Sequence, residues 1–436
     1  ENLFGLPGTF VSFEWKKLQS LLSFKSAVSL MLILALSLST LLMLGDKDRL
    51  NRWLRTDQIP LLEEKVEELE EKLALMNKTG KPTSQRKRLE EEIKHHQNLL
   101  EEQRVLKDTL NHQKSTLFYE RQQSRIKSHF GYGDLKGALL GYVHGDYASN
   151  FGYVVSMKRN ELLIENNIHP MIGLSALPTI YDEMEVPADE LTFFMESQPA
   201  NHSTLQLIHR SLVYYRVDWI LMALMVAFCG SGLSTDQQHG LAWIYTLPRK
   251  RRQILSDKLK ASLLLSIELL AVFFLTLGIY GLLTQGIGQW NFPFLEYLWK
   301  VPHPYRGLDL EGYFRFIPLG VALLKIFLFM VVATVFLQIF SLFLSTFKLK
   351  PIPLLALTLL LAGGGYLLSL VDTLKGIMAF LPFAYIDPVG IVSGKRVAQS
   401  AQETMSFLPA LLILFLWAFL FYLLTHLRPS KKKDVL

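Results

Sequence analysis

The chain has 436 residues, of which half are hydrophobic, and a formal net charge of +6. Uncharged runs of about 20 residues, the length that crosses a bilayer, alternate with a Glu- and Lys-rich block between Asp46 and Lys127 that no hydrocarbon core accepts. This combination excludes an ordinary soluble core, and basic residues placed beside apolar runs indicate membrane topology rather than nucleic-acid binding. The expected fold class is an all-α polytopic membrane protein. With Cys229 as its single cysteine, the chain has no intramolecular disulfide.

The chain opens with an amphipathic segment, residues 1–25, which is expected to form a helix lying in the interface on the cytoplasmic side. The first apolar run has no small-residue cleavage site behind it, so a retained signal anchor is expected. In total, six runs are interpreted as transmembrane helices: Ser26–Gly45, Val217–Leu233, Ala261–Leu283, Ile317–Phe347, Ile352–Val371 and Leu408–Leu427.

Basic residues predict which loops face the cytoplasm. The loop 234–260, the link at Lys348 and Lys350, and the tail 428–436 are rich in lysine and arginine, so these segments and both termini are expected inside. The segments expected outside are 46–215, 284–316 and 372–407. A multi-pass protein of a bacterial plasma membrane is therefore expected.

The first outside segment contains a predicted helical hairpin, residues 46–128, followed by a mixed subdomain, residues 129–215. Before a turn at 77–82, apolar residues alternate spacings of four and three, as in a coiled coil, and a similar stripe continues after it. The two sets are Leu62, Val66, Leu69, Leu73 and Met76, then Leu99, Leu106, Leu110 and Leu117. Two amphipathic helices packed on the rest of the domain are the alternative. The mixed subdomain, with its alternating stretch Tyr153–Met157, is expected to be mostly irregular.

Catalytic and metal-binding motifs are not found in the sequence. The stretch Gly390–Arg396 has three residues between its glycines instead of four, and no Ser or Thr follows Lys395, so it is no phosphate-binding loop. The histidines do not show the spacing of a zinc site. The expectation is a protein that is not itself an enzyme, without a cofactor or metal of its own.

Two ionisable residues lie within predicted spans, Glu268 and Lys325. Such residues mark a transport pathway or an internal pair. Their depths, at about 1.5 Å per residue, place Glu268 in the inner half and Lys325 nearer the outer surface. The preferred interpretation is therefore a snorkelling Lys325 and a Glu268 paired with another helix, rather than a direct ion pair.

The loop after the second predicted span carries the first specific pattern. Ser234 and Gln237 resemble a capping box that opens a short helix ending near Leu247, and Pro248 suits the first turn of a second helix. The segment resembles the coupling loop of ABC type-2 exporter permeases, in which an acidic residue and a glycine precede a proline, an arginine and a lysine. The residues that the resemblance assigns to ATPase coupling are Asp236, Gly240, Trp243, Pro248, Arg249, Arg251, Arg252 and Lys258.

A second pattern lies between the last two predicted spans, where Leu381 to Pro388 resembles the same family's Pro-x-x-Tyr-x-(Asp/Asn)-Pro segment. Locally, Thr373–Phe380 is too short to span a bilayer and is followed by prolines, so re-entrant half-helices are expected over 372–407. The residues of this extracellular motif are Pro382, Tyr385, Asp387, Pro388 and Gly394.

The resemblance implies the transmembrane subunit of an exporter, working with a second permease copy or a related permease and with two cytoplasmic ATPase subunits that supply ATP and Mg. Apolar span surfaces favour an amphipathic cargo such as a peptide, an antibiotic or a lipid-like molecule. The alternatives are a sodium-extruding permease, a mechanotransmission or envelope-regulatory subunit, and a receptor or scaffold without transport. Membrane lipids and a cell-envelope partner at the hairpin are further expected partners, and nucleic acid is not.

Overall fold

The structure, a computed structural model, describes residues 24–55, 59–79, 83–112, 150–168, 179–181, 203–213, 215–229, 251–301 and 310–427. The described residues are mostly helical and fall into two compact units. The first unit comprises Glu1–Thr40, His202–His303 and Gly312–Leu436, and the second comprises Leu41–Asn201 and Pro304–Glu311.

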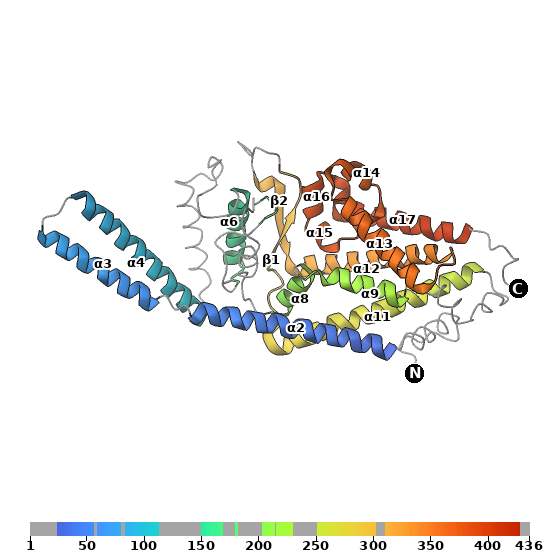
Figure 1. Cartoon of the computed structure of the whole chain (residues 1–436), viewed down its shortest axis with the longest axis horizontal. Coiled ribbons are helices and arrows are strands. Elements are labelled where there is room, and N and C mark those ends of the chain that lie inside the picture. The colour runs from blue at the N-terminus through green and yellow to red at the C-terminus, as the bar shows by residue number, and fades with distance from the viewer. Residues whose placement is uncertain are drawn as a thin grey trace. The chain divides into compact units, whose positions relative to one another are not determined.

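The second unit contains the predicted helical hairpin, formed by α3 (Ile59–Thr79) and α4 (Thr83–His112), which pack side by side (Figure 1). The pairs Gln97–Glu70 and Arg104–Glu63 show that the helices are antiparallel, since the number rises on one helix as it falls on the other. The buried seam consists of Val66, Leu69, Ile93 and Leu100. An antiparallel pair of helices therefore lies within the range predicted to form a helical hairpin. On the second arm, however, Leu100 takes the buried position expected for Leu99, which is half-buried.

Two boundaries in this part of the chain differ from the expectation. Helix α2 runs from Phe24 to Arg55, ten residues beyond the predicted end of the first apolar run at Gly45, so the hairpin begins at Ile59 rather than at residue 46. A charged, helix-favouring sequence continues the helix because an α-helix satisfies its own backbone in water as well as in hydrocarbon.

The mixed subdomain is not irregular where the structure describes it. Asn150–Glu165 forms α6, which includes the alternating stretch Tyr153–Met157. Its fully buried Phe151, Val155 and Leu163 are separated by one, then two helical turns. Five alternating residues were too few to distinguish a period of two from one of 3.6.

The first unit holds the long apolar helices. Four described helices are long and apolar enough to cross a membrane: Gln253–Thr284 within α11 (Arg251–Gln285), α12 (Leu319–Ser345), α13 (Pro351–Leu368) and α17 (Phe407–Leu427). The helices α8 (Thr204–Val213) and α9 (Val217–Cys229) pass the same test as a pair bent by 73°, and Ser26–Leu42 is a shorter apolar helix. Several long apolar helices are typical of a membrane-embedded protein, which is the class that the sequence predicted.

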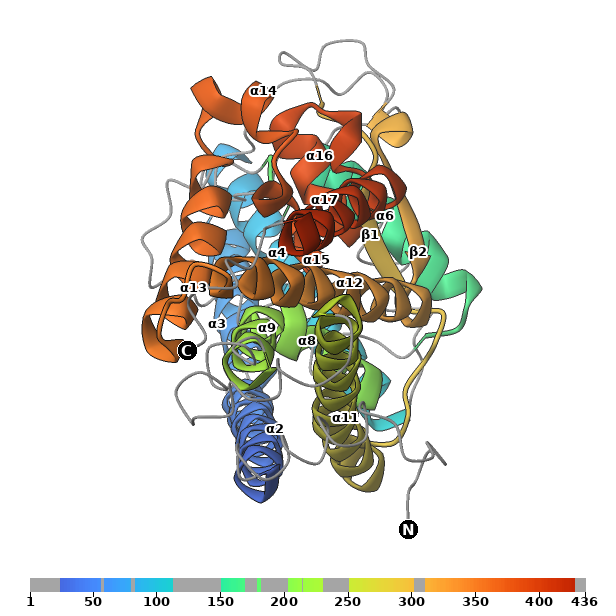
Figure 2. The same cartoon turned by 90° about the vertical axis from the view of Figure 1, so that its right-hand side faces the viewer.

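Helix α12 is the centre of this unit and the most deeply buried of the four long apolar helices. It packs against α17 on one side and against α9 and α11 on the other (Figure 2). Phe329 and Phe336, both fully buried, lie on α12, and Phe336 contacts the rings of Phe383 and Phe421. Helices α13 and α17 keep much of their apolar surface exposed, as lipid-facing helices do.

Two short strands contradict the all-α prediction. β1 (Pro293–Tyr297) and β2 (Phe314–Pro318) pair antiparallel within the stretch expected to be a loop, with Glu296 opposite Arg315. The span predicted from Ile317 therefore begins at Leu319. Of the residues of β2, the prediction places only Ile317 and Pro318 in the span. Pro318 has an extended backbone and cannot donate to a helix, so it separates strand from helix.

The segment between α13 and α17 consists of short helices, which confirms that it does not form another long span. They are η3 (Asp372–Leu374), α14 (Lys375–Met378), η4 (Pro382–Tyr385), α15 (Pro388–Val392), α16 (Lys395–Ser400) and η5 (Glu403–Met405). The segment is fastened to β1, because the Tyr297 N–H donates to the Ser393 carbonyl at 2.8 Å. Gly394 follows with φ +69°, and a Cβ there would lie 1.8 Å from the Tyr297 carbonyl oxygen.

Candidate functional site

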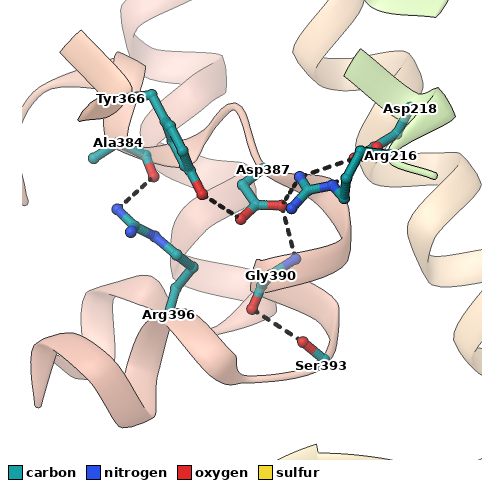
Figure 3. A network of polar contacts seen from close by, with 8 residues as sticks. All are labelled: Arg216, Asp218, Tyr366, Ala384, Asp387, Gly390, Ser393 and Arg396. Atoms are coloured by element: carbon teal, nitrogen blue, oxygen red, sulfur yellow. Dashed lines mark hydrogen bonds and ion pairs between the residues drawn. The ribbon is translucent and has the colours of Figure 1, made fainter. Parts of the chain in front are cut away.

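Asp387 is the centre of a buried polar network (Figure 3). It is the N-cap of α15, where its carboxylate accepts a hydrogen bond from the Gly390 N–H at 2.9 Å, and Pro388 occupies the first turn. Gly390 leaves room for this arrangement, since a Cβ there would lie 2.2 Å from the Asp387 carboxylate. The local sequence Asp-Pro-x-Gly thus holds the carboxylate in a defined direction.

Arg216 brings a charge to this carboxylate from a distant part of the chain. It lies at the break between α8 and α9 with φ +48°, a left-handed backbone that is uncommon for a residue with a side chain. Its guanidinium lies 2.6 Å from Asp387 and 3.3 Å from Asp218, the second residue of α9. One arginine therefore bridges two carboxylates, both almost completely buried.

Tyr366 on α13 adds a third element to the network. Its hydroxyl donates to the second oxygen of Asp387 at 2.9 Å. Its ring packs edge-on against Trp219, whose centroid lies 4.7 Å away, and Trp219 also faces the guanidinium of Arg216. The network consequently joins the start of α9, the end of α13 and the short-helix segment.

Arg396 on α16 completes the network on the far side of Tyr366 (Figure 3). Its guanidinium lies 5.0 Å from the centre of the Tyr366 ring and donates to Ser369 and to the carbonyl of Ala384. The side chain is buried, and its Nε has no hydrogen-bond partner among the described residues. Burial lowers the pKa of the neighbouring Lys395, while the charge of Asp387 acts in the opposite direction.

The network joins three elements through buried charged groups. Buried ion pairs of this kind cost desolvation and tolerate little misalignment, so they specify one geometry of the elements they join. Arg216 is the most accessible charged member, with 37% of its side chain exposed. No group of three or more His, Cys, Asp or Glu suitable for a metal ion occurs in the described part of the chain.

The five residues of the predicted extracellular motif lie together in one segment and have different roles. Pro382 begins η4, and Tyr385 is fully buried with its hydroxyl donating to the Ala379 carbonyl. Pro388 begins α15, and Gly394 makes the close approach to β1. Asp387 connects the segment to the start of α9 through Arg216 and to α13 through Tyr366.

The structure does not bring the two predicted intramembrane charges together. Lys325 on α12 lies 3.9 Å from Glu296 of β1, and its ammonium faces the ring of Phe407 at 5.6 Å. Glu268 is half-buried on α11 and has a partner of its own. Lys325 therefore has a carboxylate partner in β1.

Most of the predicted coupling residues, namely Asp236, Gly240, Trp243, Pro248 and Arg249, lie outside the described residues. Arg251 and Arg252 are the first residues of α11, and Lys258 is buried two turns further along the helix. The short helix predicted from Ser234 to Leu247 also falls outside the described part.

The residues that sequence reasoning missed are the partners of Asp387. Arg216 and Asp218 were visible as an Arg-x-Asp pair at the start of an apolar run, which is an unusual place for two charges. Tyr366 and Arg396 carried no comparable signal. Comparison of the chain with protein family models, with curated proteins and with solved structures gives no match.

Proposed function

We propose that the chain is the permease subunit of an ABC-type exporter, powered by a separate ATPase. The observation that carries the proposal is the role of Asp387, which occupies the acidic position of the family's Pro-x-x-Tyr-x-(Asp/Asn)-Pro pattern. It binds Arg216 and Tyr366, and so ties the short-helix segment to two apolar helices. A transport path that opens at this end must move these elements together or break their contacts.

The proposed topology has six spans. The six are the four long apolar helices, the predicted span Val217–Leu233, whose described part is α9, and the first predicted span, which contains the apolar helix Ser26–Leu42. With the basic segments inside, the coiled-coil-like hairpin and the short-helix segment lie outside in a plasma membrane. The cargo that suits apolar span surfaces is amphipathic, such as a peptide, an antibiotic or a lipid-like molecule.

Cysteine labelling tests this topology. In a chain with Cys229 replaced by alanine, single cysteines are introduced at Lys78, at the end of α3, and at Lys250. We expect an impermeant maleimide to label position 78 in intact cells and position 250 only after the membrane is opened, because the positive-inside bias separates the two sites. Labelling of both positions from the same side would rule out the six-span scheme.

Charge reversal tests coupling to an ATPase. The double variant R251E/R252E places two negative charges at the start of α11, where the proposal expects a docked ATPase. Loss of matched charges at a protein interface slows association and weakens binding. We expect at least about tenfold less ATPase to co-purify with the variant from native membranes, equivalent to roughly 1.4 kcal/mol, and a matching loss of permease-stimulated hydrolysis.

The matched control is R86E/R88E, which reverses two basic residues of α4 in the hairpin. It is expected to leave co-purification and hydrolysis unchanged. Wild-type levels of both in R251E/R252E would remove α11 as the docking surface, and absence of any ATPase with the wild-type chain would favour a receptor or scaffold. Stimulated hydrolysis without export from reconstituted vesicles would instead favour mechanotransmission.

A further inference from the structure

A second charged cluster lies at the junction of the β-hairpin and α12. Arg315 of β2 donates through Nε to the Glu296 carboxylate of β1 at 2.6 Å, and Lys325 of α12 approaches the other carboxylate oxygen at 3.9 Å. Glu296 and Arg315 are directly opposite each other in the strand pairing. Two cations thus share one carboxylate, which leaves the cluster with a charge of +1.

The two cations are accessible although the carboxylate is not. The side chain of Glu296 is 11% exposed, that of Lys325 is 26% exposed and that of Arg315 is 55% exposed. Arg315 uses Nε for Glu296, and more than half of its side chain remains exposed. Since the buried carboxylate orients both cations without covering them, the cluster presents a positively charged surface.

The surroundings of Lys325 are apolar and exposed. Leu324, Phe327 and Leu328 lie next to it on α12, and each is at least 39% exposed. An exposed apolar surface on a helix that is long enough to cross a membrane is a surface for acyl chains. The backbone of Lys325 therefore lies among exposed apolar side chains, while its ammonium lies in the charged cluster, as for a snorkelling lysine.

Two tryptophans indicate that the N-terminal end of α12 lies near the level of lipid headgroups. The Trp290 carbonyl accepts a hydrogen bond from the Gly320 N–H at 3.1 Å. The indole ring of Trp290 lies against Gly320, where an added Cβ would be 2.1 Å from the ring. Trp290 and Trp299, in the segments flanking β1, are both about half exposed. Half-exposed tryptophans beside a long apolar helix are typical of the membrane interface.

We propose that Arg315 and Lys325 bind the phosphate of an anionic phospholipid, with Glu296 holding the two cations in position and the acyl chains lying along Leu324 and Leu328. A planar guanidinium beside an ammonium matches a phosphate monoanion in charge and geometry. A lipid is favoured over a soluble phosphate because the site borders an apolar exposed surface. The binding site does not depend on the proposed function, which decides only the leaflet in which this lipid lies.

Native mass spectrometry of the purified full-length chain tests the site. The detergent-solubilised protein is titrated with phosphatidylglycerol and, separately, with phosphatidylcholine, which has the same acyl chains and no net charge. We expect selective binding of phosphatidylglycerol, weakened about fivefold in R315Q and in K325Q and about 25-fold in R315Q/K325Q, from the usual contribution of one basic residue near an anionic surface. The control R86Q, which removes an exposed arginine paired with Glu90, is expected to bind as wild type does.

The variant E296Q is expected to change lipid affinity in the opposite direction. Glutamine keeps an oxygen that accepts from Arg315 Nε, so the cations stay in position, while the cluster charge rises from +1 to +2. Phosphatidylglycerol is therefore expected to bind about fivefold more tightly. A purely structural ion pair predicts instead that all three substitutions lower the thermal unfolding temperature without changing lipid preference. Equal binding of the two lipids, wild-type affinity in R315Q/K325Q, weaker binding by E296Q, or displacement of the lipid by millimolar inorganic phosphate would each overturn the proposal.

Discussion

Replacing Asp387 with asparagine is expected to lower the free energy of unfolding by roughly 1–3 kcal/mol, the cost of leaving a buried hydrogen-bonding partner unsatisfied. Asparagine keeps the size of the side chain and still accepts the hydrogen bond from Gly390. It removes the charge that lies 2.6 Å from Arg216, which then has Asp218 as its remaining carboxylate partner. Denaturation of the purified protein in detergent, with a far-ultraviolet signal for helix content, measures the change.

A double-mutant cycle shows whether the cost comes from the pair. R216Q and D387N each leave a partner charge without its main counterpart, whereas the double variant removes both. We expect the double variant to cost less than the sum of the singles by at least about 1 kcal/mol, as for residues in direct contact. Strictly additive costs would contradict a direct pair. The control K158Q breaks the exposed pair between Lys158 and Glu161 and is expected to change the free energy of unfolding by less than about 1 kcal/mol.

The same cycle bears on transport. If the short-helix segment moves with α9 and α13, then D387N is expected to reduce permease-stimulated ATP hydrolysis while co-purification of the ATPase remains at the wild-type level. The coupling surface that we propose at Arg251 and Arg252 and the Asp387 network are tested by different variants. A loss of co-purification in D387N would show that the network maintains the whole subunit rather than one moving part.

Replacing Gly394 with alanine is the second substitution with a large expected effect. The backbone there has φ +69°, which costs roughly 1–2 kcal/mol for a residue with a Cβ. The added Cβ would also lie 1.8 Å from the Tyr297 carbonyl oxygen, so α16 and β1 must separate. We expect a loss of at least about 2 kcal/mol, from the left-handed backbone together with the displaced strand.

Two measurements check this expectation. Thermal unfolding gives the loss of stability, and hydrogen exchange of the Tyr297 amide reports the hydrogen bond to Ser393, which should weaken when the elements separate. The matched control is G363A in α13, where a Cβ would meet no atom within 4 Å and alanine favours the helix. It is expected to be neutral or slightly stabilising. A G394A variant with unchanged unfolding and unchanged exchange would show that the contact with Tyr297 carries no strain.

Some features of this protein follow from its local sequence and others only from its tertiary packing. The sequence by itself determined the long apolar helices, the hairpin of α3 and α4, and the proline-broken segment after α13. Each of these follows from a local property, because hydropathy, helical spacing and proline geometry act over at most a few turns of chain. The same locality explains the failures at Tyr153–Met157 and at β2, where short stretches satisfied two patterns at once.

Only the tertiary structure decided the partners of the charged residues. Arg216 and Asp387 are 171 positions apart, and Tyr366 and Arg396 reach the same network from two further helices. Lys325 proved to pair with Glu296 of a strand that the sequence did not predict. Which charges meet depends on how helix faces pack, and packing is set by the combined shape and burial of many side chains rather than by the spacing of any one segment.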